Sequence, residues 1–104
     1  MNMPEAMLVS GQKAVDARIV GEKALSVLSV SRLRMLRELA REEKYPAELA
    51  RALKMSVQTA YYHIRLLADA GLVELASYEQ KGGALAKKYK CSAEAVAIVV
   101  GGEW

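Results

Sequence analysis

Residues 46–75 read PAELARALKMSVQTAYYHIRLLADAGLVEL, and this stretch decides the fold. Its first part has apolar residues at helical spacing, and Pro46 suits the first turn of a helix because no amide proton is needed there. Lys54 and Met55 then leave room for only a very tight turn. The stretch therefore predicts a short helix followed closely by a second one. The apolar face of the first helix consists of Leu49, Ala50 and Leu53.

The second helix has a clear beginning and end in the sequence. Ser56 is a good N-cap, and Gly71 supplies the C-terminal stop. Between them, apolar residues recur at offsets of three and four, which predicts a single buried stripe. Two helices joined by a tight turn and followed by a strand are the outline of a helix-turn-helix. The buried stripe consists of Val57, Ala60, Ile64 and Leu67.

The opposite side of the second helix is polar, given about 100° per residue. Its side chains can donate to or accept from base edges and phosphates, and a helix N-terminus favours an anion. The alternative is a face that only confers solubility, but such a face more usually carries Glu and Lys. The outward residues are Gln58, Thr59, Tyr62, Arg65 and Asp69, with Tyr61 and His63 on the flanks.

A basic hairpin is predicted after the second helix. Residues 81–90 contain four lysines and no acid, which should concentrate positive potential there. The turn Gln80-Lys81-Gly82-Gly83 is rich in residues that accept positive φ. Lysines beside a recognition helix would neutralise phosphates rather than read sequence, although lysines also protect strand edges from aggregation. The lysines are Lys81, Lys87, Lys88 and Lys90.

The segment Met55 to Val73 resembles the recognition helix and following strand of the arsenical-repressor (ArsR-type) winged helix-turn-helix regulators. Leu28 to Leu39 is similar to the helix that precedes the motif in that family, with Arg32 matching its characteristic arginine. Gly82-Gly83-Ala84 followed by Lys87-Lys88-Tyr89 is similar to the wing of archaeal members.

This resemblance covers roughly residues 22 to 91, and the match from Ser56 to Gly71 is its specific part. It implies a winged helix-turn-helix domain over residues 22–91 and repression by blocking polymerase access. The metal-sensing members of the family use cysteine pairs or histidine and carboxylate clusters. This chain has only Cys91 and His63, so we expect no metal site, no cofactor and no metal sensing.

The composition of the chain excludes some classes of protein but does not by itself indicate a function. A chain of 104 residues is expected to form one domain, and a net charge of +3 does not by itself demand a nucleic-acid partner. The sequence shows no glycine-rich phosphate loop, nucleophile elbow or paired-carboxylate constellation. We therefore expect that the protein is not an enzyme. No apolar run is long enough to cross a membrane and no signal peptide opens the chain. The lone Cys91 fits a reducing, cytoplasmic compartment, as an idle thiol or else as an intersubunit disulfide.

The region before the motif predicts two more helices. Residues 22–29 form a short one, and Ser31 is expected to cap a longer one that runs to about Arg41. On its polar side, Arg34 and Glu38 stand four apart and can pair weakly. The apolar side of this helix carries Leu33, Leu36 and Ala40, with Met35 and Leu39 beside them.

Both ends of the chain are apolar. In the extension over residues 1–21, Met7 to Val20 suggests short strands around a turn. In residues 92–104, the run Ala95 to Val100 follows Ser92, a candidate cap, and its six apolar residues do not distinguish helix from strand. Because a small winged helix has little core left, we expect these ends to form a dimer interface, with packing inside the monomer as the alternative.

The sequence thus predicts a mainly α protein with a small β-hairpin wing, acting as a homodimeric, sequence-specific regulator that binds double-stranded DNA. One alternative is a protein-interaction module of the transcription machinery, which should show apolar or acidic residues at Gln58, Tyr62 and Arg65. Another is an RNA-binding winged helix, since tyrosines also stack on unpaired bases. The effector is unknown. The predicted DNA contacts are Ser56, Gln58, Thr59, Tyr61, Tyr62, His63, Arg65, Lys81, Lys87 and Lys88.

Overall fold

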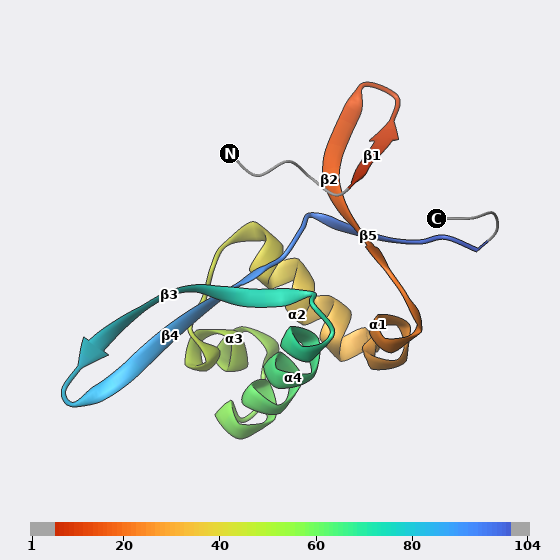
Figure 1. Ribbon diagram of the computed structural model, residues 1–104. Coiled ribbons are helices and arrows are strands. Elements are labelled where there is room, and N and C mark those ends of the chain that lie inside the picture. The colour runs from red at the N-terminus through yellow and green to blue at the C-terminus, as the bar shows by residue number, and fades with distance from the viewer. Residues whose placement is uncertain (1–5, 101–104) are drawn as a thin grey trace.

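The computed structural model describes residues 6–100, which form a helical body between two β sheets (Figure 1). The elements are β1 (Ala6–Ser10), β2 (Lys13–Val20), α1 (Glu22–Val27), α2 (Val30–Arg41), α3 (Pro46–Leu53), α4 (Val57–Asp69), β3 (Val73–Lys81), β4 (Ala84–Cys91) and β5 (Ala95–Ile98). Strands β3 and β4 form the wing, while β1, β2 and β5 form a terminal sheet. The two project from different ends of the body. The expectation of a mainly α protein is wrong: 41% of residues 6–100 are helix and 37% strand, because the terminal sheet adds to the wing.

The core lies where α2, α3 and α4 meet. Met35, Leu49 and Leu67 come from these three helices and are completely buried, and Leu72 closes the core at the start of the wing. This is the burial that the apolar stripes of α3 and α4 predicted. One residue of the predicted stripe differs: Val57 is 43% exposed, because it lies in the first turn of α4 beyond the edge of the core.

Helix α2 is rotated relative to the prediction. Its most buried residues are Met35 and Leu39. Leu36 is buried as predicted, but Leu33 is 43% exposed and Ala40 is also exposed. Leu33 and Ala40 instead border a shallow hollow beneath residues 91–96. A helix presents only one narrow face to a core, so the flanking apolar residues remain at its border.

Two local predictions for α2 are also wrong. Ser29, not Ser31, is the N-cap: its backbone is extended and its hydroxyl accepts a hydrogen bond of 3.2 Å from the Arg32 amide. Both serines are capping residues by type, and the helix starts two residues earlier than expected. Glu38 pairs with Arg41 at 3.9 Å rather than with Arg34.

The turn between α3 and α4 confirms the predicted tight connection. Lys54 adopts left-handed backbone angles, with φ 56° and ψ 49°, and the Met55 amide donates to the Ala50 carbonyl at 3.0 Å. Ser56 then caps α4 and Gly71, with φ 78°, ends it, both as predicted. The left-handed turn lets α4 cross α3 after only three residues.

The wing is a long hairpin with a kink. Gly82 and Gly83, with φ 55° and 83°, make a two-residue turn between Lys81 and Ala84, as glycines allow. The register shifts between Leu75 and Ser77, which marks a β-bulge and bends the strand. At its base, the backbones of Lys44 and Tyr89 exchange two hydrogen bonds of 3.0 and 2.9 Å, so the loop before α3 is fixed to the wing.

The terminal sheet has the order β1-β2-β5. The predicted strands around a turn near Gly11 are confirmed as the antiparallel pair β1 and β2. Residues 95–98 of the C-terminal run form the strand β5, which pairs parallel with β2 of the same chain, so this part packs within the monomer. Ser92 caps no helix; its amide donates to the Leu72 carbonyl at 2.9 Å. Residues 101–104 lie outside the described part.

Candidate nucleic-acid interface

The N-terminus of α4 is fixed by two hydroxyl groups. Ser56 Oγ accepts a hydrogen bond from the Thr59 amide at 3.1 Å and donates to Thr59 Oγ1 at 2.8 Å. Both side chains are exposed, yet the Ser56 hydroxyl is already used in the cap. We therefore read Ser56 chiefly as a residue that positions α4, while the Thr59 hydroxyl can still donate to an acceptor.

Three long side chains stand on the outer face of α4. Gln58, Tyr62 and Arg65 are exposed, opposite the buried Ala60 and Ile64. An amide, a phenol and a guanidinium on one helical face supply both donors and acceptors for base edges. The predicted polar face is therefore accessible on the molecule.

Tyr61 flanks this face on the side of the wing. It is 48% exposed and lines a hollow shared with Arg65, Lys87 and Tyr89. Burial, and then the nearby Tyr61, raise the pKa of Tyr89. Tyr61 on α4 and Lys87 on the wing thus line the same hollow.

His63 lies on the other flank and turns toward the body. It is half-buried, and its Nδ1 accepts a hydrogen bond of 3.1 Å from Arg32 Nε. Arg32 also donates to the Val27 carbonyl at 2.9 Å and lies 5.9 Å from the centre of the Tyr62 ring. Burial, and then Arg32, lower the pKa of His63. His63 therefore packs, which leaves only Nε2 for any contact outside the protein.

The wing is less positive than residues 81–90 alone suggest. Strand pairing brings two acids from β3 beside the lysines of that segment: Lys81 Nζ lies 3.2 Å from Glu79 Oε1, and Lys90 Nζ lies 3.5 Å from Glu74 Oε1. Lys87 and Lys88 have no such carboxylate partner within residues 6–100. The free positive charge is thus centred on these two lysines.

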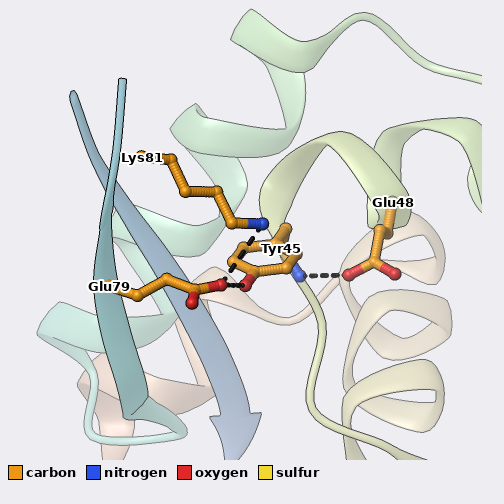
Figure 2. Close-up of polar contacts among 4 residues, drawn as sticks. All are labelled: Tyr45, Glu48, Glu79 and Lys81. Atoms are coloured by element: carbon orange, nitrogen blue, oxygen red, sulfur yellow. Dashed lines mark hydrogen bonds and ion pairs between the residues drawn. The ribbon is translucent and has the colours of Figure 1, made fainter. Parts of the chain in front are cut away.

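Tyr45 joins the wing to the start of α3 (Figure 2). Its hydroxyl donates to Glu79 Oε1 at 2.5 Å, and its amide donates to Glu48 Oε1 at 2.8 Å. The ammonium groups of Lys81 and Lys88 lie 4.8 and 5.0 Å from the centre of its ring. We call Tyr45, Glu79, Lys81 and Lys88 the Tyr45 cluster.

The Tyr45 cluster adjoins the recognition helix. An open groove of about 290 Å³ runs from Tyr45 and Lys81 to Val57 and Tyr61 on α4, with Lys87 on its rim. Residues of the Tyr45 cluster and of α4 therefore line one groove. The exposed Val57, wrongly predicted to be core, also lines this groove.

Sequence reasoning missed Tyr45 and Glu79 and gave Arg32 no structural role. Tyr45 stands directly before the proline that opens α3, where no local pattern marks it as a binding residue. Glu79 and Tyr45 are 34 positions apart, and Arg32 and His63 are 31 apart. No local pattern joins residues at such separations.

Other chemistry is sparse within residues 6–100. No three His, Cys, Asp or Glu side chains come close enough to hold a metal ion there. Cys91 is half-buried, its Sγ donates to the Ala93 carbonyl at 2.9 Å, and burial raises its pKa. None of the helices in this range is long and apolar enough to span a membrane.

Known proteins with similar sequences and structures also contain a helix-turn-helix. Residues 27–76 match the model of a helix-turn-helix domain family. A crystal structure of a possible transcriptional regulatory protein (fragment 1–100) from Mycobacterium bovis is 30% identical, with a TM-score of 0.53 over 67% of this chain and 68% of that one. The chain belongs to the winged helix-turn-helix family. A solution structure of Mb0332 from Mycobacterium bovis, named as the homodimeric winged helix-turn-helix DNA-binding domain of a possible ArsR-family regulator, is 27% identical with a TM-score of 0.56.

This winged helix-turn-helix protein covers 61% of the chain in that solution structure, while 67% of its own length is matched. A possible transcriptional regulator from Methanosarcina mazei has the same fold at 18% identity, with a TM-score of 0.54 over 83% of this chain and 73% of that one. No sequence similarity to a curated protein was found.

Proposed function

We propose that this protein is a sequence-specific regulator of transcription that binds double-stranded DNA. The observation that carries the proposal is the exposed face of α4, where Gln58, Tyr62 and Arg65 stand beside a wing whose Lys87 and Lys88 have no carboxylate partner. A helix of this kind fits the major groove, and lysines at its side neutralise the flanking phosphates.

The roles of the side chains follow from their positions. Arg65 and Gln58 can form paired hydrogen bonds with guanine and adenine edges, respectively. Tyr61, Tyr62 and Thr59 add contacts at the rim of the groove, and Lys81, Lys87 and Lys88 hold the backbone. His63 positions α4 through Arg32 rather than contacting DNA directly.

We further propose a cytoplasmic homodimer that represses by blocking polymerase access. A two-fold dimer presents two recognition helices to successive turns of DNA, which gives affinity that a single small domain lacks. In support, a 27% identical relative is named as homodimeric. The terminal sheet also exposes Met7, Leu8 and Val9 on consecutive positions of an outer strand, which is unusual for a surface left bare.

The deciding experiment is selection from random duplex DNA with the purified protein. A palindromic motif with half-sites one turn apart is the expected result, and it would establish base reading and dimeric binding together. Enrichment of no motif, combined with duplex affinity no higher than that for single-stranded RNA, would contradict the proposal and favour RNA or protein recognition.

A further inference from the structure

Two strong donors lie close to one oxygen atom of the Tyr45 cluster. The Tyr45 hydroxyl and Lys81 Nζ lie 2.5 and 3.2 Å from the same atom, Glu79 Oε1 (Figure 2). The carboxylate comes from β3 of the wing, whereas Tyr45 stands at the start of α3. The cluster therefore holds an anion between the wing and the helix-turn-helix.

Further positive charge surrounds this anion. Lys88 stands over the Tyr45 ring at 5.0 Å, beside Lys81 at 4.8 Å. The pKa of Glu79 is lowered first by the Tyr45 hydrogen bond, then by Lys81, with a smaller effect from Lys88. A phenol and an ammonium group close to one anionic oxygen, with a second ammonium group beside the same ring, are equally suited to a phosphate oxygen.

The cluster is also accessible. The side chains of Glu79 and Lys81 are 55% and 58% exposed, and the groove beside them leads to α4. An exposed ion pair stabilises a protein little, so its carboxylate can be replaced by another anion at small cost. Glu48, the other acid at this groove, is already bound to the Tyr45 amide.

We propose that Tyr45, Lys81 and Lys88 form a binding site for a DNA backbone phosphate, and that Glu79 occupies this site in the free protein until the phosphate displaces it. The proposal rests on the proposed DNA-binding function and adds a site and a competing internal ligand. Glu79 keeps the donors in place before binding and lowers affinity for DNA in general.

This role predicts that removing the Glu79 charge raises duplex affinity, which a purely structural role of Glu79 does not predict. Glu79→Gln keeps an oxygen that accepts from Tyr45 but removes the competing charge, so affinity for any duplex should rise. The gain should correspond to about one additional phosphate contact, and so be about threefold larger at 50 mM than at 200 mM salt. If Glu79 only fixed the wing, the substitution would leave affinity unchanged or reduce it.

Glu74→Gln is the matched control. It removes the same charge from the same strand, but Glu74 pairs with Lys90 at 3.5 Å and does not contact Tyr45. Duplex affinities of the wild type and both variants should be measured by fluorescence anisotropy across this salt range, on one random duplex. A Glu79→Gln gain that exceeds the Glu74→Gln gain and has a steeper salt dependence supports the proposal; equal or smaller gains overturn it.

Two further measurements separate the site from the overall function. Tyr45→Phe in the Glu79→Gln background should lose most of the gain, because the phenol donor is removed while the ring remains. Pyrophosphate should shift the ring-proton NMR signals of Tyr45 more strongly in Glu79→Gln than in Glu74→Gln. A pyrophosphate response without duplex binding would refute the DNA function but keep an anion site; no selective response to either ligand would refute the site.

Discussion

Arg32 Nε donates a hydrogen bond to His63 Nδ1 at 3.1 Å, which joins the first turn of α2 to the recognition helix. Because Nδ1 is the acceptor, His63 must be neutral with its proton on Nε2 for this bond to form. Protonation would place a second cation against Arg32 and remove the bond. The same guanidinium holds the Val27 carbonyl, so α1, α2 and α4 meet at one side chain.

Stability should therefore fall in mild acid. The folded pKa of His63 is lowered below its unfolded value of about 6.5. The unfolded chain then binds the proton more tightly, so stability from this group is complete above about pH 6.5 and is lost as pH falls through the lower folded pKa. Urea midpoints from pH 8 to pH 5 should show this decline.

His63→Asn is the control for this pH dependence. Its amide oxygen can replace Nδ1 as an acceptor for Arg32 but does not titrate. The part of the decline that begins near pH 6.5 should be absent in the variant. Parallel curves for wild type and variant would show that other groups, such as carboxylates, account for the acid sensitivity.

Features encoded within a few residues were predictable. The Ser56 cap, the Gly71 stop and the Gly82-Gly83 turn all depend on conformations that few residue types favour, and the structure has each in place. The cap of α2 was harder, because Ser29 and Ser31 are both suitable and only packing selects between them.

Features that depend on distant segments were not predictable. Strand β5 pairs with β2 from the other end of the chain, which no periodicity encodes. The lysine-rich segment 81–90 looked uncompensated until β3 brought Glu74 and Glu79 beside it. Tyr45 acquires its role only because Lys44 bonds to Tyr89 and sets the loop against the wing.

Lys54→Gly should stabilise the protein. Lys54 holds a left-handed conformation, with φ 56°, in the helix-turn-helix turn, where a side chain is strained and glycine is not. Glycine also gives the unfolded chain more conformational entropy, which offsets part of this effect. The free energy of unfolding should still rise by about 0.5 to 1 kcal/mol. Urea unfolding should detect it. Lys54→Ala keeps the Cβ and serves as the control; an equal gain in that variant would attribute the effect to lost charge instead.

Self-association should depend on the terminal sheet. We expect a dimer by sedimentation at tens of micromolar. Val9→Lys on β1 should shift it toward monomer, because a charge on an outer strand opposes pairing. Val30→Lys is the matched control, since Val30 on α2 is 68% exposed and Val9 is 66% exposed. A wild-type monomer, or equal effects of both substitutions, would contradict this interface.

Metal ions should not alter DNA affinity. The chain has one cysteine and one histidine, and His63 is already bound to Arg32, so soft ligands are too few even across two subunits. Zinc, arsenite and a chelator should each leave duplex affinity unchanged. A stoichiometric metal in the purified protein, or a tenfold shift in affinity on adding one, would contradict this expectation.

Base reading and backbone binding should separate by mutation. Gln58→Ala or Arg65→Ala removes a side chain from the outer face of α4, so the preferred site should lose about 1–3 kcal/mol while random duplexes lose less. Replacing Lys87 and Lys88 together with Ala should weaken all duplexes about equally. The slope of log affinity against log salt should then be shallower by about one to two units.

Titrations of a preferred and a random duplex across salt concentrations distinguish these outcomes, since only the α4 variants should change the ratio of the two affinities. Asp69→Ala serves as a control variant, because it alters an exposed residue of α4 at the opposite end of the helix from Gln58. If the α4 and wing substitutions both left duplex affinity unchanged at moderate salt, the exposed face of α4 would not be a DNA-reading surface. The protein-interaction alternative would then take the place of DNA binding.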